Sequence, residues 1–146
     1  MQIQPAIFIN IILAVIALFY YYKGSRQFYL KEPTFLRYLA LAIILDAITA
    51  VLGSFGITPT TTIPGSNFVP WRSILFISHV ILATVGFFGF IALLIVVLVK
   101  GKDLPYPKLR NFQYKILLPM WILGESIALI NSLGKILFGL RLYDYI

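Results

Sequence analysis

The chain contains no cysteine, a single histidine and only five acidic residues among its 146 residues. The lack of cysteine excludes disulfides, thiolate zinc sites, iron–sulfur clusters and CxxC redox chemistry. One histidine excludes bis-histidine haem ligation within one chain. The sequence also lacks an HExxH motif, a glycine-rich phosphate loop, a Ser/His/Asp triad order and a carboxylate-rich metal cluster. We therefore expect no catalytic residue, no metal site and no cofactor.

Apolar residues dominate what remains. The chain is 60% hydrophobic and 16% aromatic, with a mean hydropathy of +0.93. So large an apolar fraction cannot be hidden behind a water-compatible surface, which predicts an all-α integral membrane protein. Because a helix needs about 20 apolar residues to cross the hydrocarbon core, the length allows one domain, residues 1–146, with four spans. The apolar runs place these spans at about 5–22, 35–53, 71–99 and 116–139.

The net charge of +7 is distributed between the apolar runs rather than along one face. Basic residues fall in the first and third connecting segments: Lys23, Arg26, Lys31 and Arg37, then Lys100, Lys102, Lys108, Arg110 and Lys115. The middle, Thr-rich loop contributes only Arg72 at its end. The positive-inside rule predicts that both basic segments are cytoplasmic and that both termini face outward. We expect an up-down-up-down four-helix bundle in a cell membrane, with a prokaryotic plasma membrane favoured and no nucleic-acid partner.

Five polar side chains within the spans are candidates for chemistry: Asp46, His79, Glu125, Asn131 and Lys135. An ionisable group at the centre of a span costs about 2.5 to 3.5 kcal/mol and is normally paired or functional. At about 1.5 Å rise per residue, Asp46, His79 and Asn131 lie at one depth, roughly 12 Å below the outer surface, and Glu125 lies near the midplane. We predict an Asp46–His79 hydrogen bond in this polar layer, with Asn131 as a third partner.

The polar layer has three interpretations at this stage: hydrogen bonding between helices, a proton relay, or a cofactor or metal site. The midplane carboxyl of Glu125 must be protonated, paired across helices, or facing a partner or cavity. Arg72 and Lys135 lie near the outer interface, where long basic side chains extend toward water.

Small residues predict where the helices approach closely, because lipid provides no hydrophobic drive for helix association. They recur at three- or four-residue spacing in the third and fourth spans: Ala83, Gly86, Gly89 and Ala92, then Gly124, Ala128 and Ser132. We expect these faces to be buried in the bundle, and an alternative is that one of them contacts a partner protein.

The second half of the chain resembles a known family. The stretch "NFVPWRSILFISHVILATV", a basic loop and "LPMW" opening the fourth span are similar to the CtaM/YozB-like family of small four-helix membrane proteins, over roughly residues 67–138. Arg72, His79, Pro119 and Trp121 match its pattern. The resemblance implies a link to the maturation or activity of haem-copper terminal oxidases. The further histidines of that family are absent here, so a site built from several histidines is not expected.

These observations predict a non-catalytic small membrane protein associated with a respiratory haem-copper terminal oxidase, as an accessory subunit or a maturation factor. Its partners would be other membrane subunits and lipids. The alternative is a small proton-coupled transporter that acts as a homodimer, with Glu125 or Asp46 as the titrating group.

Overall fold

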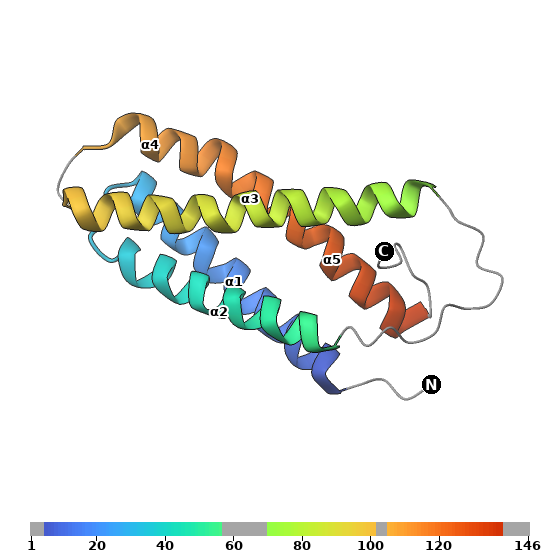
Figure 1. Cartoon of the computed structure of the whole chain (residues 1–146). Helices are drawn as coiled ribbons and strands as arrows, with labels where there is room; N and C mark the ends of the chain where they lie inside the picture. The colour runs from blue at the N-terminus through green and yellow to red at the C-terminus, as the bar shows by residue number, and fades with distance from the viewer. Residues whose placement is uncertain (1–4, 57–69, 102–104, 139–146) are drawn as a thin grey trace.

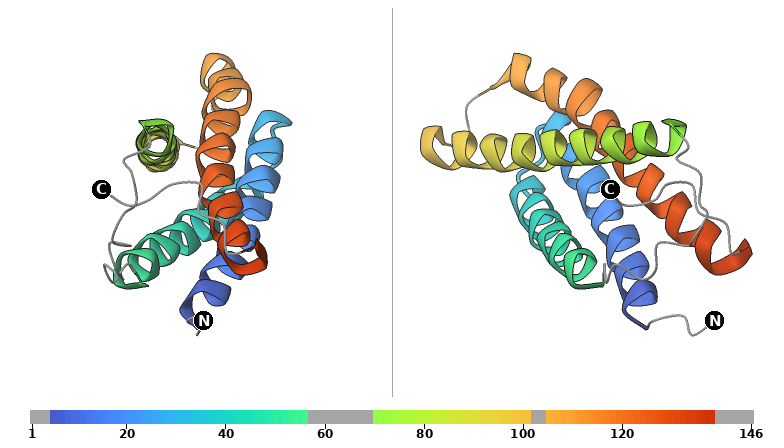
Figure 2. Two further views of the ribbon diagram at one scale, coloured as in Figure 1. Left: turned by 90° about the vertical axis from the view of Figure 1, so that its right-hand side faces the viewer. Right: turned by 45° about the vertical axis from the view of Figure 1, so that its right-hand side comes forward.

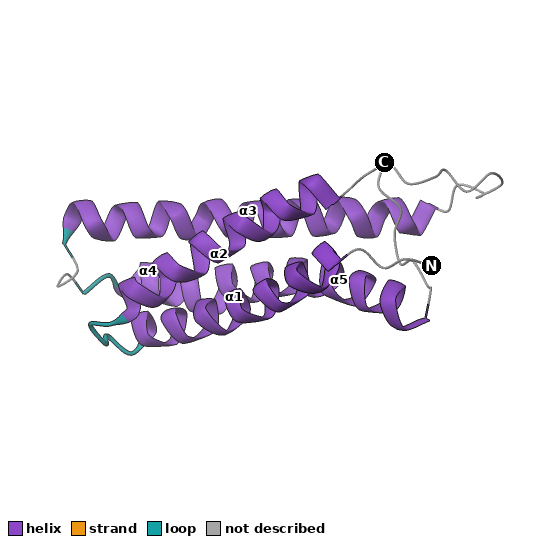
Figure 3. Ribbon diagram, turned by 90° about the horizontal axis from the view of Figure 1, so that it is seen from below, coloured by secondary structure: helices purple, strands orange, loops and turns teal. Residues whose placement is uncertain are grey.

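The computed structural model describes residues 5–56, 70–101 and 105–138, and within these ranges it contains helices and no strand (Figures 1 and 3). The elements are α1 Pro5–Tyr29, α2 Phe35–Gly56, α3 Pro70–Lys100, α4 Pro107–Phe112, the π-helix η1 Gln113–Leu117 and α5 Leu118–Phe138. Four segments are long and apolar enough to cross a membrane: Phe8–Tyr29, Phe35–Gly53, Trp71–Lys100 and Pro107–Phe138. The predicted all-α class and the four apolar spans are confirmed.

The first helix continues well past its predicted end at Tyr22. It ends instead at Tyr29, and Lys31, two residues farther on, adopts a left-handed conformation with a φ of 66°. The Glu32 N–H donates to the Gln27 carbonyl over 2.9 Å, and the Lys31 N–H donates to the Phe28 carbonyl over 3.3 Å. This arrangement closes a helix end, with lysine at the position where glycine is most common.

The fourth span also begins earlier than predicted, because residues 107–115 are helical rather than part of a proline-broken loop. Pro107 occupies the first turn, where its missing N–H costs nothing. Pro119 cannot donate to the helix ladder and its ring crowds the preceding turn. The helix widens shortly before Pro119 into the π-helix η1, which ends at Leu117 and in which the Leu118 N–H reaches the Gln113 carbonyl five residues back.

The helices pack mainly as two pairs, α1 with α2 and α3 with α5. The ends of α1 and α3 and the beginnings of α2 and α4 lie together at the left of Figure 1. We call this the basic end, because Lys31, Arg37, Lys100 and Lys108 are exposed there. The buried core joins the two pairs and comprises Tyr21, Phe28, Phe35, Leu39, Ala42, Phe90, Leu93, Val97, Leu117, Leu118 and Trp121.

The other half of α3 is not covered in the same way. No residue from 71 to 85 is buried, whereas Gly86, Phe90, Leu93 and Val97 are. Figure 2 shows α3 diverging from α2 toward this far end. Among the described residues, the bundle is therefore more tightly packed toward its basic end than toward its far end.

Glycines set the close contact between α3 and α5. A Cβ at Gly86 would lie 2.6 Å from the Trp121 Cβ, and one at Gly124 would lie 2.7 Å from the backbone nitrogen of Ala83. The Trp121 Cβ is fixed by its backbone as firmly as the Ala83 nitrogen, so no rotamer change relieves either contact and both glycines are required for this packing. The expected burial holds for Gly86 and Gly124, whereas Ala92 is exposed and lies outside the packed face.

Candidate functional site

Asp46 is the centre of a polar cluster that spans three helices. Its Oδ2 atom accepts a 3.0 Å hydrogen bond from the Tyr21 hydroxyl of α1 and a 2.9 Å hydrogen bond from the Trp121 indole Nε1 of α5. The Asp46 side chain is only 7% exposed. The Thr49 hydroxyl donates to the Asp46 backbone carbonyl over 2.7 Å, which satisfies a further polar group in the same turn of α2.

Aromatic rings enclose this carboxylate. The Tyr21 ring centroid lies 4.2 Å from that of Trp121 and 4.5 Å from that of Phe90, so α3 is also joined to the cluster. Hydrogen bonds between membrane helices average about 0.6 kcal/mol and reach about 1.7 kcal/mol. Two bonds near the upper value offset most of the roughly 2.5 to 3.5 kcal/mol that an aspartate costs within a span.

Sequence reasoning missed Tyr21, because it stands in the aromatic run "FYYYKGSR" that is typical of a membrane interface. A signal for its burial was present. Ala17, Tyr21, Ser25 and Phe28 are each buried and recur every three or four residues, which is the spacing of one helix face. Gly24 continues this face, and a Cβ there would lie 2.9 Å from the Leu39 side chain of α2.

His79 links α3 to α5 rather than to Asp46. Its Nδ1 atom lies 2.8 Å from the Gly124 carbonyl oxygen. A carbonyl oxygen can only accept, so Nδ1 carries the proton in this bond. The predicted Asp46–His79 hydrogen bond is corrected, because the Asp46 carboxylate takes its donors from Tyr21 and Trp121.

The predicted layer of Asp46, His79 and Asn131 is corrected as well. His79 bonds at the level of Gly124, whereas Asn131 lies seven residues, or about 10 Å, farther along α5. Asn131 is buried, with 4% of its surface exposed. Depth counting assumed parallel helices, but α3 diverges from α2 (Figure 2), and the bond to Gly124 places His79 beside Glu125 in the sequence of α5.

Glu125 lies one turn beyond Trp121 on α5 and is half-buried. Its carboxyl group interacts electrostatically with the carboxyl group of Asp46 and with the hydroxyl group of Tyr21. No hydrogen bond joins it to another residue in the described ranges. Glu125 therefore belongs to the Asp46 cluster in space, although its own polar atoms are not used to hold the helices together.

The remaining motif residues lie on either side of this cluster. Arg72 is half-buried near the start of α3, with its guanidinium carbon 5.6 Å from the Trp71 ring centroid. Pro119 is the second residue of α5, two positions after the last residue of the π-helix. Lys135 lies in α5, and its side chain is outside the described part of the chain.

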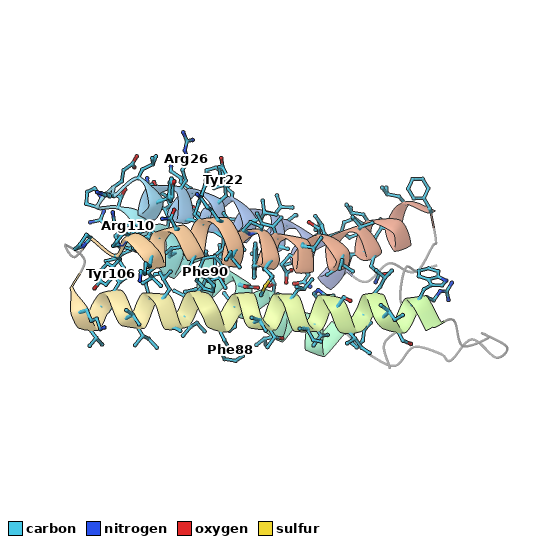
Figure 4. All side chains as sticks on the ribbon, turned by 90° about the horizontal axis from the view of Figure 1, so that it is seen from above. Tyr22, Arg26, Phe88, Phe90, Tyr106 and Arg110 are labelled. Carbon is cyan, nitrogen blue, oxygen red and sulfur yellow. The ribbon has the colours of Figure 1, made fainter. Side chains whose placement is uncertain are left out.

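A second set of buried polar groups, which sequence reasoning missed, lies toward the basic end. Ser25 and Gln113 are fully buried, and the Ser25 Oγ, Gln113 Nε2 and Gln113 Oε1 atoms make no hydrogen bond to any residue that the structure describes. Arg110 is buried one turn before Gln113, with its guanidinium carbon 5.2 Å from the Phe28 ring centroid. Figure 4 shows Arg110 and Tyr106 at this end, and Phe88 and Phe90 on opposite sides of α3.

In residues 5–56, 70–101 and 105–138, no group of three or more His, Cys, Asp or Glu side chains is placed to hold a metal ion. The cluster offers one carboxylate with two donors, a second carboxyl beside it, and an imidazole bonded to a backbone carbonyl. Comparison with known proteins finds no matching family model, no similar curated protein and no similar solved structure.

Proposed function

We propose that this chain is a non-catalytic membrane protein that associates with other membrane subunits, as an accessory subunit or a maturation factor. The observation that carries the proposal is the lower burial of the first half of α3, in which no residue from 71 to 85 is buried. Phe90 packs against Tyr21 of α1, whereas Ala83 and Phe76, seven and fourteen residues earlier on the same face, are not buried. A helix face that is buried in the core at one end and only half-buried at the other, within a membrane span, is suited to packing against a partner protein.

The site chemistry supports a binding role over a catalytic one. The Asp46 carboxylate and the His79 Nδ1 atom are both used in bonds between helices. Groups held in this way position helices, and they are not presented to a substrate. Of the motif residues shared with the CtaM/YozB-like family, His79 and Trp121 both make such bonds, so the resemblance and the packing concern the same residues.

The partner that the resemblance implies is a respiratory haem-copper terminal oxidase. On this proposal the helices form an up-down-up-down bundle with both termini outside and the basic end in the cytoplasm, as the distribution of lysine and arginine favours. The membrane would be a prokaryotic plasma membrane.

Photo-cross-linking within native membranes tests the association. Benzoylphenylalanine replaces Phe76, which is half-buried, or Phe88, which is 61% exposed on the opposite side of α3 from Phe90. We expect Phe76 to cross-link to oxidase subunits that carry haem absorption after purification in mild detergent, and Phe88 to label lipid. Equal labelling at the two positions, or purification without any haem-containing subunit, would contradict the proposal.

A second candidate function is proton-coupled transport by a homodimer, which the proximity of the Asp46 and Glu125 carboxyl groups favours. Purified protein in proteoliposomes tests it. Under this alternative, substrate flux driven by a pH gradient is lost in Glu125→Gln and retained in Glu32→Gln, whose carboxyl is exposed at the basic end.

A further inference from the structure

Lys23 of α1 lies between two aromatic rings, at the level where the apolar run of its helix ends. Its ammonium nitrogen is 4.4 Å from the ring centroid of Tyr38 on α2 and 5.7 Å from that of Phe19, one turn earlier on α1. The Tyr20 ring stacks against the Tyr38 ring with a centroid separation of 5.9 Å. The position of the ammonium group is therefore set by contacts with both helices of the α1–α2 pair.

This cation has no acidic partner in the part of the chain that the structure describes. The described carboxyl side chains are those of Glu32, Asp46 and Glu125, and none of them forms an ion pair with Lys23. Attraction to aromatic rings orients an ammonium group without neutralising its charge. Lys23 is half-buried, so salt would screen a bound anion less than it screens an anion at an exposed lysine. The charge at this place favours an anionic ligand.

An exposed apolar strip runs along α1 from Lys23 toward the far end of the bundle. On the same face of α1, at three- or four-residue spacing, lie Phe19, Ile16 and Ile12, and each of them is exposed. Ile12 is eleven residues from Lys23, or about 16 Å along the helix. This length is about half of the roughly 30 Å hydrocarbon core, which is the depth of one lipid leaflet. A ligand with a charged group at Lys23 and an apolar chain along the strip has the shape of a lipid.

The other side of Lys23, toward the basic end, is polar. Gln27 lies one turn farther along α1, and its Oε1 atom accepts a 2.9 Å hydrogen bond from the Thr34 hydroxyl. Arg26 and Arg37 are exposed in the same region. Lys23 is therefore at the boundary between an apolar strip and a basic polar surface, which is the level of lipid headgroups in a membrane.

We propose that Lys23, Tyr38 and the apolar strip bind an anionic phospholipid, with its phosphate at the Lys23 ammonium group and an acyl chain along α1. This binding does not depend on an oxidase partner, and it requires only that the four apolar helices span a membrane. An anionic phospholipid fits better than a zwitterionic one, because choline or ethanolamine would bring a further cation to a surface that already contains Arg26 and Arg37.

Titration of the full-length protein with lipid, followed by native mass spectrometry, tests the site. The probe is phosphatidylglycerol and the reference lipid is phosphatidylcholine. One basic side chain near the membrane surface changes the affinity for anionic lipid by about fivefold. We expect Lys23→Gln to weaken phosphatidylglycerol binding by about this factor and Lys23→Arg to preserve binding. Lys108→Gln makes the same change in net charge at an exposed position of the basic end and should weaken binding far less.

Variants of Tyr38 keep the test informative if Lys23→Gln perturbs folding. Tyr38→Leu should weaken phosphatidylglycerol binding, because it removes a ring that positions the ammonium group, and Tyr38→Phe should preserve binding. Glycerophosphoglycerol, which is the same headgroup without acyl chains, should not displace the lipid, because it cannot use the apolar strip.

Three results would overturn the proposal. The first is equal weakening by Lys23→Gln and Lys108→Gln, which would show a general effect of surface charge. The second is equal affinity of the wild-type protein for phosphatidylglycerol and phosphatidylcholine. The third is displacement of the lipid by glycerophosphoglycerol, which would show that the site takes a soluble phosphate ester and not a lipid.

Discussion

Asp46 and Trp121 are 75 positions apart in the sequence and are joined by a 2.9 Å hydrogen bond in the middle of the bundle. The bond connects the α1–α2 pair to the α3–α5 pair. The same Asp46 oxygen accepts from Tyr21, so one buried atom holds donors from both pairs. Within the buried core that joins the two pairs, this carboxylate and two aromatic side chains provide the hydrogen bonds that link them.

The two donors should compensate for one another. Tyr21→Phe and Trp121→Phe each remove one donor and keep an aromatic ring, so each should lower the free energy of unfolding by about 1 to 2 kcal/mol. The double variant should lose more than the sum, because the carboxylate then has no donor from either ring. Equilibrium unfolding in mixed detergent micelles measures these values. In the control background Asp46→Leu, the two changes should become nearly additive; persistent coupling there would refute the role of Asp46.

The contact at Gly124 should not tolerate a methyl group. Gly124→Ala places a Cβ 2.7 Å from the Ala83 backbone nitrogen, which forces α3 and α5 apart and should cost about 1 to 3 kcal/mol. Gly53→Ala is the matched control, since its Cβ meets only the Asn10 side chain at an ordinary 3.6 Å. Thermal unfolding in detergent compares the two variants. A Gly124→Ala protein as stable as the control would show that the helices separate more easily than this packing implies.

The His79 bond predicts that the imidazole carries its proton on Nδ1, and that an amide side chain at position 79 recovers part of the stability. Nitrogen-15 NMR should find the proton on Nδ1, which donates to the Gly124 carbonyl. His79→Asn can place an amide donor near the position of Nδ1, so it should retain more stability than His79→Leu, which should lose about 1 kcal/mol. Neither change should remove an absorption band from the purified protein. A Soret band that disappears with the imidazole would instead identify His79 as a haem ligand.

The π-helix should depend on Pro119. Pro119→Ala restores an N–H donor and removes the ring clash, so a regular α-helix becomes possible and residues 107–113 should rotate by about 100° relative to α5. Tyr29 and Tyr114, whose ring centroids are 4.8 Å apart, report on this rotation.

Cysteines at positions 29 and 114 provide the measurement, because the chain has no other thiol. A short bifunctional thiol reagent should cross-link this pair efficiently in the parent protein and poorly after Pro119→Ala. Unchanged cross-linking in the proline variant would mean that packing against α1, and not Pro119, maintains the π-helix.

Hydropathy located the four spans because apolar content alone determines which segments enter lipid. It could not locate the C-terminal end of α1, after which Lys31 adopts a left-handed conformation, or the start of α4, where Pro107 fits the first helical turn. Both features depend on local backbone geometry that leaves no apolar signal.

The sequence predicted the carboxylates of the candidate site, but it did not predict the residues that form hydrogen bonds with Asp46. Asp46 and Glu125 are conspicuous because a charge within a span is rare. Tyr21 and Trp121 each have one polar atom on a large apolar ring, so the sequence pattern identifies them with the membrane interface or with packing. The pairing of His79 with Gly124 was hidden for another reason, since a backbone carbonyl is present at every position and only the path of α3 selects this one.

The Tyr21–Asp46 bond lies wholly within the first two helices, 25 positions apart, whereas Trp121 is synthesised much later. During insertion into the membrane, the aspartate can therefore acquire its first donor before the second pair of helices exists. Tyr21 would protect the carboxylate during biosynthesis, and Trp121 would then complete the arrangement when α5 arrives. The order of donors along the chain thus matches the order in which the emerging protein needs them.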